Sequence, residues 1–122
     1  LGGELWAKLD AGTQAWFERV DGTGLSLDRV EANILASARA QPLILQCMFV
    51  ALGEDTPDYA EITAWLERLE RLRAGGAQIA LVQVYTSARA PADPSVRPLP
   101  PTRLAEIGAR VARLGLPVQV VA

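Results

Sequence analysis

The fold of this chain is decided by the stretch Ile79-Ala-Leu-Val-Gln-Val-Tyr-Thr-Ser-Ala-Arg89. Its first half is a run of apolar and β-branched residues, the pattern of a buried strand, and polar residues gather where the run ends. In parallel sheets, ligands bind at the carboxyl ends of the strands, where loops and helix N-termini meet. We therefore expect any binding site of this chain to lie at the end of this strand.

A pattern of alternating strands and helices extends from this stretch in both directions. Apolar runs predict strands at residues 5–10, 43–50, 78–86 and 117–121. Helical periodicity separates them, at 13–20 and 26–40, then from 56 to a Gly pair at 75–76, and after a Pro pair at 100–101. Strands separated by helices pair in parallel through right-handed crossovers. We predict an α/β fold with about four parallel strands alternating with helices.

The helix predicted from residue 56 has clear start and stop signals. Thr56 can cap its free N–H groups, Pro57 suits the first helical position, and Asp58 favours the positive end of the helix dipole. The apolar stripe of this helix includes Trp65, which we expect in the core. The charged residues between the stripe positions predict a solvated outer face, formed by Glu67, Arg68, Glu70, Arg71 and Arg73.

Composition excludes several classes of function. The chain has 122 residues, 50% of them hydrophobic, and a net charge of -2, so it forms one compact domain or part of one and offers no electrostatic case for nucleic acid. It contains no histidine and one cysteine, Cys47, which excludes a Ser/His/Asp triad, a Cys/His dyad and an ordinary zinc site within the chain. Cys47 lies in an apolar run, where we expect a buried structural thiol. No run approaches the roughly 20 apolar residues that span a bilayer, and we expect a cytoplasmic protein without membrane contact.

Polar residues recur near the ends of the predicted strands. Because side chains alternate along a strand, Lys8 with Asp10, Gln46 with Met48, and Gln83 with Tyr85 can each lie on one face. Unpaired charges on a buried face cost several kcal/mol, so these groups need partners. Two alternatives follow: the polar residues bind one another, with Lys8 pairing with Asp10, or they bind a ligand.

Several of these segments together resemble a known family. They are Leu5-Trp-Ala-Lys-Leu-Asp-Ala-Gly12, Phe17-Glu-Arg-Val20, the strand at 44–50, and Val82-Gln-Val-Tyr-Thr-Ser-Ala-Arg-Ala-Pro-Ala-Asp93. In this combination the chain resembles the C-terminal half of radical S-adenosylmethionine enzymes, in particular iron-sulfur oxidoreductases related to the tRNA wyosine-synthesis enzymes. The resemblance covers almost the whole chain, although its individual motifs are degenerate. The chain departs from the family at Pro100, where a Ser or Thr often precedes the last helix.

The resemblance implies a partial, half TIM-like barrel, with residues 1–122 as a single partial domain that starts at about the fourth strand. Family members bind a four-iron, four-sulfur cluster through a Cys-x3-Cys-x2-Cys loop, and this sequence has no such loop. The fragment alone is therefore expected to hold no cofactor, to bind no S-adenosylmethionine measurably and to be inactive. The inferred parent uses S-adenosylmethionine and the cluster, and the partner of the fragment is the missing N-terminal half of the barrel.

The resemblance also implies a set of cofactor-side residues at the strand ends. They are Lys8, Asp10, Gln46, Gln83, Tyr85 and Arg89. Arg89 is the strongest single candidate, because a guanidinium can bind a carboxylate or phosphate with two parallel hydrogen bonds. The alternative is that Arg89 pairs with Asp93 to fix the loop. Arg97 is expected to serve loop structure.

A second hypothesis is a non-enzymatic α/β module that binds a partner or forms a homodimer through open sheet edges. It follows from the lack of a complete catalytic set and from strand edges that four strands cannot close into a barrel. A third hypothesis, a flavodoxin-like domain that binds a phosphorylated ligand, is weaker. Its only motif is Gly22-Thr-Gly24, which lacks the spacing and the strand context of a phosphate loop.

Overall fold

A computed structural model of the chain describes residues 5–22, 24–87 and 95–121. The elements in chain order are β1 (Leu5–Lys8), α1 (Gln14–Asp21), α2 (Leu27–Ala40), β2 (Leu43–Met48), β3 (Val50–Leu52), α3 (Tyr59–Ala74), β4 (Ile79–Tyr85), β5 (Val96–Pro98), α4 (Pro101–Arg113) and β6 (Val118–Val121). The predicted α/β class is confirmed. No helix in the described part of the chain is long and apolar enough to cross a membrane.

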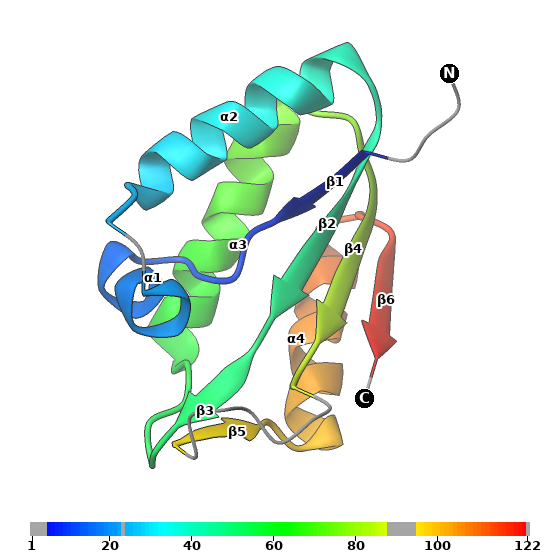
Figure 1. The fold of residues 1–122 in the computed structure, drawn as a ribbon. Helices are drawn as coiled ribbons and strands as arrows, with labels where there is room; N and C mark the ends of the chain where they lie inside the picture. The colour runs from blue at the N-terminus through cyan, green and yellow to red at the C-terminus, as the bar shows by residue number, and fades with distance from the viewer. Residues whose placement is uncertain (1–4, 23, 88–94, 122) are drawn as a thin grey trace.

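The main sheet has four parallel strands in the order β1-β2-β4-β6. The strands follow one another in space as they do along the chain, and each pair is joined by one or two helices. Because parallel crossovers share one hand, crossovers that all step in the same direction place their helices on the same face. Figure 1 shows α3 and α4 behind the strands. The sheet is therefore wound as in a barrel but does not close, and β1 and β6 are its edges.

The core lies between the sheet and the helices. Leu45 and Cys47 of β2 and Val82 and Val84 of β4 have no exposed surface, while the residues between them are half-buried. This confirms that Cys47 is a buried thiol. Trp65 of α3 is also fully buried, and its indole Nε1–H donates to the carbonyl of Leu9 at 3.1 Å. The alternation of buried and half-buried residues shows that the helices cover only one face of the sheet.

Helix α3 begins two residues later than Thr56 and Pro57 predict. Its N-cap is Asp58, whose Oδ1 accepts the backbone N–H of Glu61 at 2.8 Å. Asp58 has an extended backbone, which brings its carboxylate over the first turn, whereas Pro57 lies outside the helix. The predicted Thr56 cap is therefore wrong, because a carboxylate nearer the helix satisfies the free N–H groups instead.

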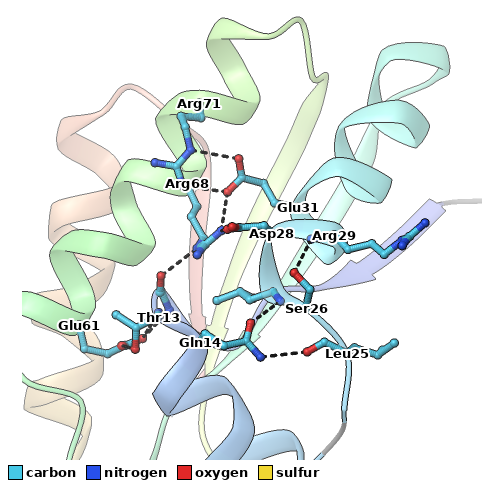
Figure 2. A network of polar contacts seen from close by, with 12 residues as sticks. Thr13, Gln14, Leu25, Ser26, Asp28, Arg29, Glu31, Glu61, Arg68 and Arg71 are labelled. Atoms are coloured by element: carbon cyan, nitrogen blue, oxygen red, sulfur yellow. Dashed lines mark hydrogen bonds and ion pairs between the residues drawn. The ribbon is translucent and has the colours of Figure 1, made fainter.

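Arg68 is buried, which corrects the prediction that it belongs to the solvated face of α3. Its guanidinium donates to the carbonyl of Gly12 at 2.8 Å and to carboxylates of Asp28 and Glu31 at 2.8 and 2.9 Å. Figure 2 shows Arg68 between α3, α2 and the loop before α1. This side of α3 is covered by α2, so the charge is buried with three acceptors around it. Arg71, one turn further on, also binds Glu31 but remains half-exposed.

A small antiparallel sheet of β3 and β5 lies beyond the carboxyl ends of β2 and β4. The sequence predicts loops at 53–56 and after β4, and does not predict β5. Strands of three residues carry too little periodicity to be recognised, and this pair forms through contacts between distant segments. Arg97 of β5 donates to the carbonyl of Gly53 at 2.9 Å, in keeping with the loop-structural role expected for it.

Candidate site at the carboxyl ends of the strands

The face of the sheet opposite the helices is named here the open face. The strand register places alternate residues on it in three rows across the sheet. The members of the open face are Trp6, Ile44 and Leu81 in the first row, Lys8, Gln46, Gln83 and Gln119 in the second, and Met48, Tyr85 and Val121 in the third. The first row is apolar and the second is polar, while the third, nearest the carboxyl ends of the strands, has Tyr85 between two apolar residues.

The second row is a ladder of three glutamines that begins beside a lysine. Gln46 Nε2 lies 3.4 Å from Gln83 Oε1, and Gln83 Nε2 donates to Gln119 Oε1 at 3.0 Å. Lys8, Gln46 and Gln83 therefore share one face, as the alternation of side chains predicts. Gln119 is a further member that was not among the predicted site residues, although its place between Val118 and Val120 already indicates the opposite face.

A pocket of about 670 Å³ opens on this face at the carboxyl ends of the strands. Its walls come from β2, β4, β6 and the start of α4, and it is lined by Gln46, Gln83, Tyr85, Thr86, Ser87, Pro98, Leu99, Pro101 and Val121. Thr86 joins the segment after β2 to the segment before α4. Its hydroxyl donates to the carbonyl of Phe49 at 2.6 Å and accepts the N–H of Leu99 at 2.9 Å. The sequence does not single out Thr86 for this role.

Helix α4 meets this pocket at its N-terminus. Pro100 is the N-cap and Pro101 the first residue, and no side chain caps the free N–H groups. This agrees with the departure noted at Pro100, where a Ser or Thr cap would have supplied an acceptor. The end of α4 is held instead through backbone contacts, such as the N–H of Arg103 donating to the carbonyl of Pro100 at 3.0 Å.

Lys8 and Asp10 pair at the end of β1. Lys8 Nζ lies 3.3 Å from Asp10 Oδ2, and Asp10 Oδ1 accepts the backbone N–H of Met48 at 2.8 Å. The Asp10 side chain is almost fully buried, with 1% of its surface exposed, whereas that of Lys8 is half-exposed. Partial burial lowers the pKa of Lys8, but Asp10 and Tyr85 outweigh it, so the pKa lies above its ordinary value. The pairing considered as one alternative from the sequence is thus present.

Two further ionisable groups border this pair. Tyr85, from the third row, is half-buried beside Lys8, and burial raises the pKa of its phenol. Asp21, the last residue of α1, is also half-buried, and burial raises its pKa to about 6, with the Asp10 charge acting in the same direction. The sequence places Asp21 just after the predicted helix at 13–20, and Asp21 was not among the predicted site residues. The effect of the Asp10 charge on Asp21 depends on how α1 folds back on β1, which no local pattern reveals.

The position of Asp10 is fixed by the anchoring of the β1–α1 loop to α3. Glu61 of α3, itself buried, accepts the backbone N–H of Gly12 and the hydroxyl of Thr13, the latter at 2.5 Å. Gly12 packs so closely on α3 that a Cβ atom there would overlap the backbone of Trp65. A rigid loop on a buried helix holds the carboxylate in place, as a preorganised site requires.

The described residues contain no group of three or more His, Cys, Asp or Glu side chains that could hold a metal ion. Cys47 points to the helix side of the sheet, and burial raises the pKa of its thiol well above the ordinary value. Arg89 and Asp93, predicted as an anion-binding residue and its alternative partner, lie outside the described residues.

Three comparisons with known proteins found nothing similar to this chain. No family model matches it, nor does a curated protein or a solved structure.

Proposed function

We propose that this chain is the C-terminal half of a radical S-adenosylmethionine barrel, in which the open face forms part of the interior wall. The observation that carries the proposal is the polar row of Lys8, Gln46, Gln83 and Gln119, on a sheet face that none of the described helices covers. In a barrel of parallel strands this face points inward, and ligands bind at its carboxyl end. The family itself is proposed from the sequence segments around Lys8-Leu-Asp10 and Val82-Gln-Val-Tyr85.

The residues of this chain do not fit an iron-sulfur cluster. The single cysteine is buried on the helix side of β2, away from the open face, and the described residues provide no metal-binding group. Under the proposal, the cluster-binding loop belongs to the other half of the barrel. The 122-residue chain contributes residues of the open face that contact the ligand.

Several groups on the open face support a role in binding S-adenosylmethionine, which is the source of the radical chemistry in the family that the chain resembles. Gln46 and Gln83 offer amide donors and acceptors, and Tyr85 offers a hydroxyl beside a pocket of about 670 Å³. Lys8 and Asp10 add a charge pair at the end of β1. We assign Gln46, Gln83, Tyr85 and Lys8 to ligand binding and the buried Asp10 to positioning Lys8, and Arg89 remains a prediction for ligand binding.

The proposal is tested by extending the reading frame upstream of Leu1. We expect a Cys-x3-Cys-x2-Cys loop there, and we expect the longer protein, reconstituted with iron and sulfide without oxygen, to release 5′-deoxyadenosine from S-adenosylmethionine. Gln83→Leu should lower this activity, whereas Gln41→Leu, at the exposed C-cap of α2, should not. An upstream sequence without the three cysteines, or equal activity of both variants, would overturn the proposal.

A second candidate, a non-enzymatic module that self-associates, is favoured by one observation. The two edge strands expose large apolar side chains, with 43% of Trp6, 38% of Val120 and 47% of Val121 accessible. Unpaired edges with apolar residues promote pairing with another chain. Under this candidate a second copy pairs its β6 with β1 of the first.

Light scattering of the purified chain tests this candidate by measuring whether the chain is a monomer or a dimer. A dimer that Trp6→Glu and Val120→Lys each convert to a monomer supports edge pairing. Tyr59→Glu is the matched control, because Tyr59 is 75% exposed but lies on α3, away from both edges. A monomer at all concentrations, or a dimer that only Tyr59→Glu disrupts, would reject it.

A further inference from the structure

The outer edges of β1 and β6 are the two places where the main sheet can grow. All four strands run in the same direction, and within the described residues neither edge strand has an outer neighbour. Figure 1 shows the two edges on opposite sides of the sheet. A second copy can therefore place its β6 beside β1 in parallel, and its β1 beside β6 in the same way. One such pairing leaves an edge of each copy unpaired, whereas two pairings leave none.

The two edges fit each other as an apolar strand and an apolar groove. A groove of about 250 Å³ lies between β1 and α2, and its apolar lining includes Leu5, Ala7, Val30 and Ile34. On β6, Val120 is 38% exposed and lies on the helix side of the sheet, as Leu5 and Ala7 do on β1. Neighbouring strands point their paired side chains to the same side. Pairing of β6 with β1 of another copy therefore brings Val120 to this groove.

The number of strands makes this pairing close at two copies. Head-to-tail pairing of β6 with β1 continues into a filament unless the rotation between copies closes a ring. The sheet is already wound as in a barrel, with its strands in chain order. Parallel α/β barrels close with eight strands, and two copies of four strands supply that number. The two-fold axis of the dimer then coincides with the barrel axis.

The open face is suited to become the interior of such a barrel. Sheets of parallel strands are normally covered on both faces, and the open face carries the apolar residues Ile44, Leu81 and Met48. Lys8 is the only charged residue among the members of the open face, and it pairs with Asp10 at 3.3 Å. Closure therefore buries no unpaired charge.

The area of contact is large enough for a stable dimer. With about 4.8 Å between strands and about 3.3 Å per residue, four strands of about six residues present roughly 400 Å² on the open face of each copy. Together with the edges of four residues at both junctions, closure covers roughly 1,300 Å² across the two copies. Stable interfaces begin at about 1,200 Å².

We propose that the 122-residue chain forms a two-fold dimer in which β1 and β6 of the two copies pair twice and close an eight-stranded parallel barrel. The glutamine ladders of both copies then face a common interior, and the pocket of each copy gains a wall from the other. The inference does not rest on the proposed function. In the longer protein, the missing part of the barrel would occupy the same two edges.

Light scattering of the 122-residue chain and of two edge variants tests the closure. We expect twice the mass of one chain and no larger species as the concentration rises. Trp6→Glu and Val121→Lys each place a charge at an edge on the open face, so each variant alone should be monomeric where the unmodified chain is a dimer. An equal mixture of the two should recover the dimer, because one junction is unmodified and the other combines opposite charges. Tyr59→Glu, at an exposed position of α3, should remain dimeric.

Gln83→Glu distinguishes a closed barrel from pairing at the edges alone. Gln83 lies on an inner strand, and in the closed barrel its substitution buries a carboxylate without a cation. We expect the dissociation constant of the dimer to rise at least about 100-fold. Gln41→Glu, at the exposed C-cap of α2, should leave it unchanged. If Gln83→Glu does not fold, acrylamide quenching of Trp6 fluorescence decides: Trp16 and Trp65 are buried in each copy, so dimer formation should lower the quenching several-fold.

Several results would overturn the inference. They are a monomer at all concentrations, a species that grows with concentration, and a mixture of Trp6→Glu and Val121→Lys that stays monomeric. A single edge variant that remains dimeric would show pairing of two like edges, which needs only one of them. Equal dimer affinity of Gln83→Glu and the unmodified chain, or unchanged quenching of Trp6, would show that the open face is not interior. The proposed function is judged separately, by the cysteine loop and the release of 5′-deoxyadenosine.

Discussion

Gln46 and Cys47 are neighbours in the sequence but lie in opposite environments. Cys47 has no exposed surface on the helix side of β2, while Gln46 lies on the open face and contacts Gln83. The same alternation separates Val82 and Val84 from Gln83. Each strand therefore has two faces: the residues on the helix side stabilise the core, and the alternate residues on the open face are available for binding.

On the stabilising side, Trp65 is the largest fully buried residue. Its ring packs edge-on against Phe49 with centroids 4.9 Å apart, and its Nε1–H is bonded to Leu9. We expect Trp65→Ala to lower the free energy of unfolding by about 3 to 5 kcal/mol in urea denaturation. The control Tyr59→Ala, at a mostly exposed position, should cost only about 0.5 kcal/mol. Equal losses would mean that α3 does not pack as described.

Asp21, at the end of α1, makes the stability of the chain depend on pH. Its folded pKa of about 6 lies above the ordinary 3.8, so the folded state holds the proton more tightly than the unfolded state does. The resulting stabilisation is present below about pH 4 and is lost as the pH rises through 6. Asp21→Asn should therefore exceed the unmodified chain in stability at pH 7, by up to about 1 kcal/mol after allowing for solvent screening of a half-exposed group.

Urea denaturation at about pH 4 and pH 7 checks this prediction. The two proteins should differ at the higher pH and agree at the lower one. Glu70→Gln, on the exposed face of α3, provides a control for the loss of one negative charge. A difference of the same size at both pH values would contradict a raised Asp21 pKa.

At the scale of the elements, α2, α3 and the β1–α1 loop are joined by one buried guanidinium. Arg68→Met retains the apolar stem but leaves the Gly12 carbonyl and the Asp28 carboxylate without this donor. We expect a loss of about 2 to 3 kcal/mol in urea denaturation. Arg71→Met, which removes a half-exposed partner of the same Glu31, should cost less than about 1 kcal/mol. Similar losses in both variants would argue against a buried role for Arg68.

The elements also show how far the sequence predicts this structure. Long apolar runs place the four parallel strands, and their alternation places Lys8, Gln46 and Gln83 on one face, because both signals are local. Arg68 was expected outside, because helical periodicity identifies the stripe that faces the sheet but not the additional face covered by α2. The β3–β5 pair was missed for a related reason, because its contacts join segments that the sequence separates widely.

At the scale of the whole molecule, helices cover one face of the sheet, while the other face and both sheet edges lack a partner within the described residues. The open face carries a polar row and a pocket. The edge strands β1 and β6 expose Trp6 and Val121. In a closed barrel all of these would be interior or paired. We propose that this open face is half of a ligand-binding site, which another part of the barrel completes.

Calorimetric titration of S-adenosylmethionine into the 122-residue chain and into the protein extended upstream of Leu1 tests this claim most directly. The account predicts no measurable binding to the 122-residue chain and micromolar binding to the extended protein. Micromolar binding to the 122-residue chain alone, or no binding to the extended protein with its cluster assembled, would contradict it.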